Sequence, residues 1–325
     1  MHELTYICTE RRAECDGYLV PNTGSCAQPK QSVAGSYTVL LWMLLRAVKL
    51  FTEGWGQGAT HMGAALFFDV DGTLIDSYHD NRRISDALRA ELARVQGLGH
   101  KIFLSSGRSR LLLTSDLLEP GFDGLVLVNG GHVEMGGVSV FEERMDLDLA
   151  RKTVAYLDEN HCEYQLVTAG PIYTRRKNHE LRAFFSRVGH EEIFTFDYDL
   201  DEVLPRVIKM EAMVPRAERA RVTAEVSRAL GPAITCDGHG GEGTFELYPT
   251  AISKAKGVSV VLEHLGLGVE DAYAFGDGAN DLEMIRFCGH GVAMGNAEEA
   301  VKAEADLVCP PVWEDGLAQV LRELF

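Results

Sequence analysis

Two acidic residues stand two positions apart after an apolar run, in Asp69-Val70-Asp71-Gly72-Thr73. Alternate side chains of a strand share a face, so Asp69 and Asp71 could point into one crevice. Gly72 would let the chain turn sharply there. Such a pair can supply a nucleophile with a neighbouring acid–base group, or oxygen ligands for a hard cation. A solvated turn is the plainer interpretation, so the pair alone leaves catalysis open.

Two more candidate groups follow apolar segments. Ser106 offers a hydroxyl, and the backbone N–H groups of Gly107 and Arg108 could bind phosphate oxygens, although serines in this position usually cap helices. Lys254 opens a helix-like segment, where a positive charge opposes the helix dipole. An anionic neighbour would explain that lysine, and we prefer it to Lys256 because it lies nearer the strand end. A solvated surface lysine is the alternative.

The fourth candidate cluster is Gly276-Asp277-Gly278-Ala279-Asn280-Asp281, which again ends an apolar run. Asp277 is placed to bind a hard cation through oxygen. Asp281 either supports the metal ligands from behind or caps the following helix.

The segments that carry these residues alternate between strand-like and helix-like patterns. Compact apolar runs predict strands at 64–70, 101–105 and 125–128, with helices at 84–98 and 111–118 between them. This βαβαβ order predicts a doubly wound parallel sheet, whose ligands bind at the carboxyl ends of the strands. The pattern becomes mixed α+β between about 144 and 247. The α/β alternation then returns and ends in a helix predicted at 313–324. We therefore expect a core of residues 62–143 and 248–325, interrupted by a cap at 144–247.

The first 61 residues differ from the rest. Residues 37–51 form an apolar run that is short for a membrane span and contains Arg46 and Lys49. We consider two hypotheses. Either residues 1–61 are an extension that is disordered or not native, with the true start at Met62, or they form a membrane-associating or regulatory arm.

The charge of the chain limits its partners. The 325 residues include 48 acidic and 31 basic ones, for a net charge of −17. Such a charge disfavours binding of nucleic acid or anionic lipid through bulk electrostatics. An anionic substrate would need local cations or a bound metal. Seven cysteines without a C-x-x-C pair make a disulfide framework improbable in a chain of this size. The four later ones are predicted to be reduced, mostly buried thiols of a cytoplasmic protein.

Taken together, the order Asp69, Ser106, Lys254, Asp277 at four strand ends resembles the haloacid dehalogenase superfamily of phosphohydrolases. The resemblance extends over residues 62–325, and residues 1–61 have no counterpart. The long insert resembles the superfamily's C2 cap. Val128-Asn129-Gly130-Gly131 and Ala293-Met294-Gly295-Asn296-Ala297 resemble its Cof-type branch, subclass IIB, which has a C2B cap. Ser106 stands where threonine is commoner and keeps the hydroxyl.

This resemblance implies a phosphatase that acts on a small phosphorylated metabolite through an aspartyl-phosphate. Asp69 would be the nucleophile and Asp71 the proton donor and acceptor, while Ser106 and Lys254 would hold the phosphoryl oxygens. Mg²⁺ would bind the Asp69 carboxylate, the Asp71 backbone carbonyl and Asp277. The expected substrate contacts are Gly107, Arg108, Asn129, Gly130 and Asn280. The cap would choose the leaving group.

Other functions stay open at this point. A phosphosugar mutase could use the same residues, and a phospho-receiver domain or a non-catalytic sensor is a more distant alternative. We expect a monomer or a homodimer. Stable membrane association is expected only if residues 37–51 are native and exposed.

Overall fold

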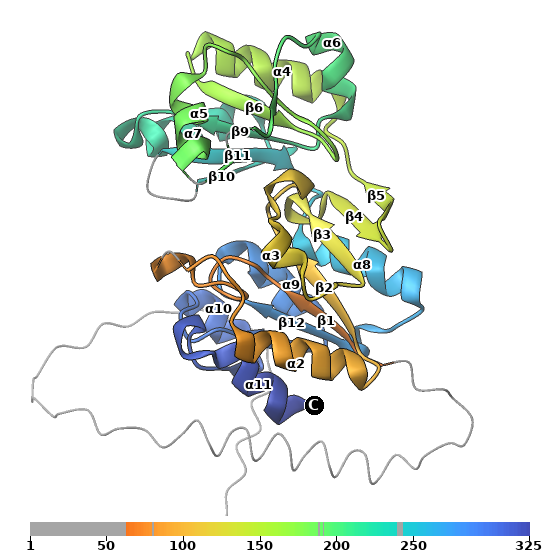
Figure 1. Ribbon diagram of the computed structural model, residues 1–325. Coiled ribbons are helices and arrows are strands. Elements are labelled where there is room, and N and C mark those ends of the chain that lie inside the picture. The colour runs from red at the N-terminus through yellow and green to blue at the C-terminus, as the bar shows by residue number, and fades with distance from the viewer. Residues whose placement is uncertain (1–62, 80, 188, 191, 239–242) are drawn as a thin grey trace, which may run out of the picture. The chain divides into compact units, whose positions relative to one another are not determined.

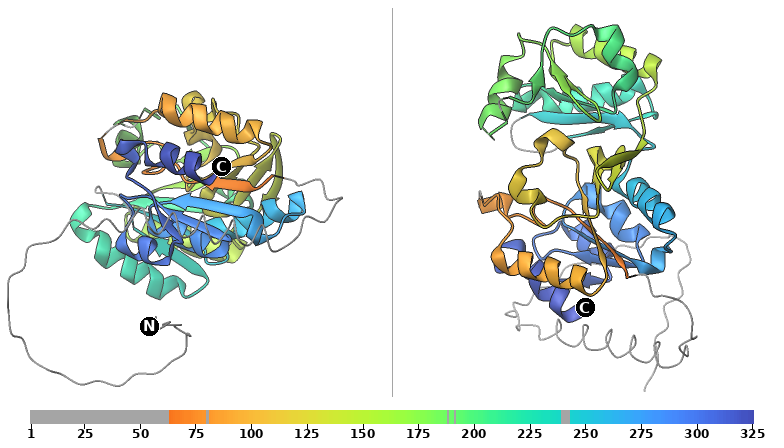
Figure 2. Two further views of the ribbon diagram at one scale, coloured as in Figure 1. Left: turned by 90° about the horizontal axis from the view of Figure 1, so that it is seen from below. Right: turned by 45° about the vertical axis from the view of Figure 1, so that its right-hand side comes forward.

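The computed structural model describes residues 63–325 except for residues 80, 188, 191 and 239–242 (Figures 1 and 2). The described residues all belong to one compact unit, Gly58–Phe325. The hypotheses about residues 1–61 and the apolar run at 37–51 therefore lie outside the described residues.

An eight-stranded sheet forms the core, in the order β14-β13-β12-β1-β2-β3-β4-β5. Its six parallel strands are β1 (Ala65–Phe68), β2 (Lys101–Ser105), β3 (Gly124–Leu127), β12 (Ala272–Gly276), β13 (His290–Ala293) and β14 (Leu307–Val308). The predicted parallel α/β sheet is thus confirmed. An antiparallel hairpin that was not predicted, β4 (His132–Met135) with β5 (Val138–Glu142), adds an edge.

Helices cover both faces of this sheet (Figure 1). Leu66 and Phe68 of β1 belong to one hydrophobic cluster with α2 (Asp86–Gly97) and α11 (Gly316–Leu324). Ala65 and Phe67 belong to a second cluster with α8 (Lys254–Leu265), α9 (Leu282–Phe287) and α10 (Glu299–Glu304). A strand with both faces buried needs apolar side chains at every position, which explains the uninterrupted apolar run before Asp69.

A second sheet of six strands is inserted between β5 and α8, in the order β10-β11-β9-β6-β7-β8. The strands are β6 (Glu163–Val167), β7 (Ile172–Thr174), β8 (Phe194–Thr195), β9 (Lys209–Met213), β10 (Ile234–Asp237) and β11 (Thr244–Pro249). The helices are α4 (Leu147–Glu159), α5 (His179–Arg187), α6 (Leu200–Val203) and α7 (Arg219–Leu230). We call residues 144–247 the cap. These limits stay a prediction, and β11 runs two residues past them.

Two predicted helices are wrong in extent. Residues 111–118 do not form one helix, because a 3-10 turn at Arg110–Leu112 is followed by the separate short helix α3 (Ser115–Leu118). The Thr114 hydroxyl accepts the Leu117 N–H at 3.4 Å, since threonine competes for backbone groups and favours a cap over a helix interior. The last helix begins at Gly316 and not at Trp313, because Asp315 has a left-handed φ of 55°.

Two further observations concern the described part of the chain. No helix in it combines the length and the apolar character needed to cross a membrane. Its cysteines Cys162, Cys236, Cys288 and Cys309 are all free, and three of the four are buried, as predicted.

Candidate active site

The register of the central strands brings three motifs to one edge of the sheet. Phe68 pairs with Leu104 of β2 and with Phe275 of β12. The Asp69 N–H continues this ladder and donates to the Phe275 carbonyl at 2.9 Å. Asp69 therefore lies beside the segments that end in Ser106 and Asp277. Carboxyl ends of neighbouring parallel strands must meet in this way.

Lys254 lies at the centre of this edge. Its Nζ is completely buried and donates to Asp69 Oδ1 at 2.5 Å and to Asp281 Oδ1 at 2.6 Å. Burial alone would lower the pKa of Lys254, but the two carboxylates outweigh it and raise this pKa, so the ammonium stays charged. Lys256, the alternative, is exposed, and its Nζ lies 5.6 Å from the ring centroid of Phe141.

The Asp281 side chain makes no capping hydrogen bond to α9, the helix that follows it. One carboxylate oxygen pairs with Lys254, and the other accepts the backbone N–H groups of Asp277 and Gly278, each at 3.0 Å. The second interaction fixes the loop after β12, which is the one that carries Asp277. Both oxygens of Asp281 are therefore already engaged in hydrogen bonds.

Asn296 and Gly72 shape the surroundings of Asp277. The Asn296 side chain donates to Asp277 Oδ2 at 3.1 Å and to the Gly72 carbonyl at 2.8 Å. Gly72 has a φ of +87°, and a Cβ atom there would lie 2.2 Å from Asp277 Oδ2. Only glycine fits, so the turn after the first motif is built around the Asp277 carboxylate.

The charges at this edge fit a divalent cation. Asp69, Asp277 and Asp281 are buried and offer ligand oxygens within 4.8 Å of one another. Three carboxylates face one ammonium, which leaves a formal charge of −3 + 1 = −2. Burial, and then the charges of Asp281 and Asp277, raise the pKa of Asp69 against the opposing effect of Lys254. An all-oxygen donor set with excess negative charge suits a hard cation.

Asp71 lies outside this buried cluster. Its side chain is 45% exposed, and Arg108 binds both of its oxygens, through Nε at 2.9 Å and Nη2 at 2.7 Å. The Ser106 hydroxyl accepts the Arg108 N–H at 3.2 Å, so this serine also stabilises its own turn. Arg108, predicted to contact substrate, is thus the partner of Asp71 and lines a cavity of about 340 Å³ with it.

The remaining predicted residues gather around the loop after β2. Asn129 has a left-handed φ of 56°; its amide donates to Glu246 Oε2 at 2.8 Å and its oxygen accepts from Asn280 at 3.3 Å. The Gly107 carbonyl accepts from Lys209 Nζ at 2.9 Å. Gly130 has a φ of +95°, and a Cβ atom there would lie 2.0 Å from the Ser253 carbonyl oxygen.

Sequence reasoning missed three residues of this site: Asn296, Lys209 and Glu246. Asn296 lies in the motif Ala293-Met294-Gly295-Asn296-Ala297, but the motif alone predicts no contact for it. Lys209 is 1% exposed and also donates to Glu246 Oε1, at 2.5 Å, and to Glu211 Oε1, at 2.7 Å. A lysine flanked by apolar residues, two positions before a glutamate, was the available signal for a buried ion pair.

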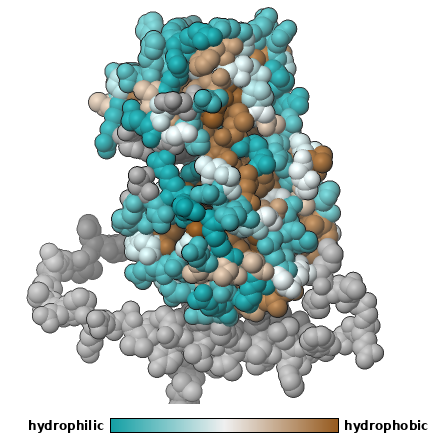
Figure 3. All heavy atoms as spheres, in the orientation of Figure 1, coloured by the Kyte–Doolittle hydropathy of each residue, from teal (hydrophilic) through white to brown (hydrophobic). Residues whose placement is uncertain are grey.

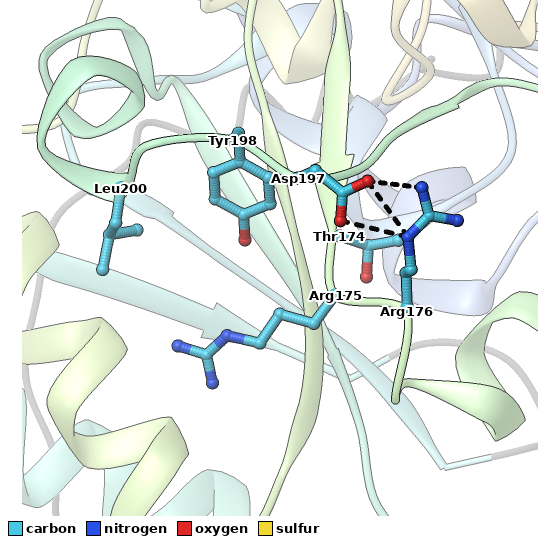
Figure 4. Close-up of a pocket in the computed structure, with 6 residues that line it drawn as sticks. All are labelled: Thr174, Arg175, Arg176, Asp197, Tyr198 and Leu200. Carbon is cyan, nitrogen blue, oxygen red and sulfur yellow. Dashed lines mark hydrogen bonds and ion pairs between the residues drawn. The ribbon is translucent and has the colours of Figure 1, made fainter.

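A second cavity, of about 260 Å³, lies in the cap and contains none of the predicted site residues (Figure 4). Arg176 forms an ion pair there with Asp197, and Arg175 is bound by Asp158, with Nη2 to Oδ2 at 2.8 Å. These arginines are neutralised within the cap.

The family model of the haloacid dehalogenase-like hydrolases matches residues 66–321. The chain belongs to this family. The putative phosphatase YkrA of Bacillus subtilis is 31% identical over 80% of this chain and 96% of its own. The 5-amino-6-(5-phospho-D-ribitylamino)uracil phosphatase YitU of the same organism is 28% identical over 80% of this chain and 97% of its own.

A solved structure agrees with this assignment. The subclass IIB sugar phosphatase BT4131 matches with a TM-score of 0.70 and 26% identity, over 80% of this chain and 98% of its own. The predicted family, fold and enzyme class, a phosphatase, are therefore confirmed. The roles of individual residues stay predictions.

Proposed function

We propose that the protein is a Mg²⁺-dependent phosphomonoester hydrolase that acts on a small phosphorylated metabolite through an aspartyl-phosphate on Asp69. The observation that carries this proposal is the buried Lys254 ammonium, which binds Asp69 and Asp281 beside Asp277. Its relatives YitU and BT4131 bear the names of an aminouracil-ribityl phosphatase and a sugar phosphatase, so substrates of either kind are candidates. The free thiols favour the reducing cytoplasm as its compartment.

Each residue would have a separate task. An Asp69 oxygen attacks phosphorus and forms a new P–O bond while the bond to the leaving oxygen breaks. The Asp71 carboxyl donates its proton to the departing alkoxide, and its carboxylate later takes one from the water that hydrolyses the intermediate. Lys254 and Ser106, with the N–H groups after it, hold the phosphoryl oxygens.

The metal would be held by the carboxylates of Asp69 and Asp277 with the Asp71 backbone carbonyl, since both oxygens of Asp281 are engaged. When bound, Mg²⁺ neutralises charge on the phosphoryl oxygens and on the nearby carboxylates. Arg108 occupies both Asp71 oxygens. Two arginine donors favour the ionised carboxylate, so this contact weakens whenever Asp71 carries the proton.

The test is phosphate release, with and without Mg²⁺, from a panel of sugar phosphates, nucleotides, flavin mononucleotide, pyridoxal 5′-phosphate and p-nitrophenyl phosphate. Asp69→Asn is the matched variant, because it keeps the shape of the side chain but removes the nucleophile. We expect it to abolish both turnover and acid-stable labelling by a radioactive phosphate ester. Wild-type turnover in Asp69→Asn would refute the mechanism. A requirement for a bisphosphate activator would indicate a mutase instead.

A further inference from the structure

The cavity that Asp71 lines has a partly apolar wall, unlike the buried carboxylates of Asp69, Asp277 and Asp281. Core residues Ile75, Leu112 and Leu117 line it together with Phe184 and Phe185 of α5 in the cap. The polar part of the lining consists of Asp71, Arg108 and His190, with Ser77, Arg82 and Thr114. Aliphatic and aromatic side chains thus meet hydrogen-bonding groups beside the predicted proton donor.

The position of this cavity beside Asp71 gives it a role in the proposed function, on which the inference rests. A general acid must lie within hydrogen-bond distance of the oxygen that it protonates. If Asp71 protonates the leaving oxygen, the alcohol half of the substrate lies beside Asp71. The cavity that Asp71 lines is therefore where that half binds, and its wall decides which alcohols are accepted.

The aromatic part of the wall is held in place by neighbouring rings. Phe185 is buried, and its ring meets that of Phe184 at 5.3 Å and 90° and that of Phe194 at 5.5 Å and 87°. Phe184 is only half-buried and lines the cavity. Aromatic rings stack or meet edge to face with other planar rings. A sugar would instead place hydroxyl groups against the Phe184 ring, which replaces none of the hydrogen bonds that they make in water.

The polar groups are also constrained. Arg108 is held by Asp71 and by the Leu112 carbonyl, which accepts from Nη1 at 3.2 Å. The backbone N–H of His190 donates to the backbone carbonyl of Phe185 at 2.9 Å, which holds His190 next to the aromatic wall. Burial, and then Arg108 and Arg82, lower the pKa of His190, so its ring is neutral at about pH 7 and offers one donor and one acceptor.

We propose that this cavity selects phosphate monoesters whose alcohol carries a planar heteroaromatic ring, with Phe184 packing against the ring and His190 hydrogen-bonding to its substituents. A volume of about 340 Å³ is near the lower end for small-molecule pockets. It suits a ring of one or two cycles and excludes a dinucleotide.

The test compares two esters that differ in the ring, pyridoxal 5′-phosphate and ribose 5-phosphate, by phosphate release with Mg²⁺. We expect kcat/KM to be at least about tenfold higher for pyridoxal 5′-phosphate in the wild type. Phe184→Ala should remove most of this preference by raising KM for the ring ester about five- to tenfold. It should change KM for ribose 5-phosphate by less than about twofold.

Phe196→Ala is the matched control, because Phe196 is another half-buried phenylalanine of the cap that contacts Arg176 and Arg182 and does not line this cavity. Phe184→Leu keeps apolar volume without the ring, and it should show a smaller change in the same direction even if the alanine variant is unstable. Equal kcat/KM for the two esters, or equal losses for both in Phe184→Leu, would overturn ring selection but leave the hydrolase intact. Failure to release phosphate from either ester and from p-nitrophenyl phosphate would overturn both proposals.

Discussion

Asp69 and Asp71 stand two residues apart, yet they have opposite surroundings. Asp69 is 6% exposed and bound by the buried Lys254 ammonium. The Asp71 side chain is 45% exposed, held by Arg108, and faces a cavity. A buried carboxylate excluded from water suits attack on phosphorus, whereas an accessible one can exchange protons with water and with a leaving group. This difference in exposure supports the proposed roles of Asp69 as nucleophile and Asp71 as proton donor and acceptor.

The role of Asp71 predicts a dependence on the leaving group. Asp71→Asn removes the transferable proton but keeps hydrogen-bonding shape. We expect kcat for an alkyl phosphate to fall by about 10²- to 10⁴-fold. The loss should be much smaller for p-nitrophenyl phosphate, whose leaving group needs no protonation. Steady-state kinetics on both esters is the measurement, and equal losses on both would argue against proton donation by Asp71.

Asn296 predicts an effect on metal affinity. Asn296→Ala removes the hydrogen bonds to Asp277 Oδ2 and to the Gly72 carbonyl. Partners that orient metal ligands typically contribute about 10- to 100-fold in affinity. We expect the Mg²⁺ concentration for half-maximal activity to rise by about tenfold, while kcat at saturating Mg²⁺ falls less. An unchanged Mg²⁺ titration would show that Asn296 supports only the turn.

At the scale of elements, the cap strands β9 and β11 are tied to loops of the core through buried charges. Lys209 of β9 binds Glu246 of β11 and the Gly107 carbonyl of the loop after β2, and Glu246 also binds Asn129. The opposing carboxylates, Glu211 first, outweigh burial and raise the pKa of Lys209. The cap sheet thus positions the loop that is predicted to bind phosphate.

Lys209→Met tests this arrangement. The change leaves Glu211 and Glu246 without their buried cation, which typically destabilises a protein by about 3 kcal/mol. We expect the free energy of unfolding, measured in urea, to fall by about that amount. Adding Glu246→Gln removes one of the uncompensated charges, so the double variant should recover part of the loss. A double variant less stable than the single one would contradict this account.

The contact between α2 and α11 predicts a pH-dependent stability. Glu91 accepts from Arg94 Nε at 2.6 Å and from Arg322 Nε at 2.7 Å. Burial would raise the pKa of Glu91, but these hydrogen bonds outweigh it and lower the pKa. An acid whose pKa is lowered by folding stabilises the protein above its unfolded pKa, and this contribution disappears as the pH falls through the folded value.

Glu91→Gln should therefore lower the free energy of unfolding by about 1 kcal/mol near pH 7, since the arginines are partly exposed. The difference from wild type should shrink below about pH 4, where Glu91 itself becomes protonated. Urea unfolding at several pH values measures it. A difference that stays constant down to acid pH would mean that packing, and not charge, causes the loss.

At the scale of the whole molecule, negative charge dominates. Hydrophilic atoms cover much of the face shown in Figure 3, and the net charge of the chain is −17. The buried carboxylates around Lys254 carry a local formal charge of −2, and they are repelled by one another and by the negative charge of the rest of the chain. A divalent cation would reduce both kinds of repulsion, so metal binding should stabilise the folded state as well as support catalysis.

Thermal unfolding tests this coupling. At a Mg²⁺ concentration of about 100 times Kd, binding to the folded state contributes about 2.7 kcal/mol. For a chain of this size we expect Tm to rise by roughly 5–10 °C over the metal-free protein. Asp277→Asn should abolish the rise, and Asp146→Asn, at the start of a cap helix, is the control that should keep it. A Tm that ignores Mg²⁺ in the wild type would contradict the metal site.

The candidate residues for the chemistry, and the sheet that carries them, could be predicted from the sequence. Strands buried on both faces require uninterrupted apolar runs, and the runs before Asp69, Ser106 and Asp277 are local features that need no partner to be recognised. Since carboxyl ends of parallel strands meet at one edge, the grouping of these residues with Lys254 could be anticipated.

The hydrogen-bond partners of those residues could be read only from the folded chain. Asp71 pairs with Arg108 across 37 positions, Lys209 reaches Gly107 across 102, and Asn296 reaches Gly72 across 224. Such contacts depend on loop paths and on how the inserted sheet meets the core, and no periodicity or local propensity encodes them. The residues that line the cavity beside Asp71 also come together only in the folded chain, because α5 and the core segments that line it are far apart in sequence.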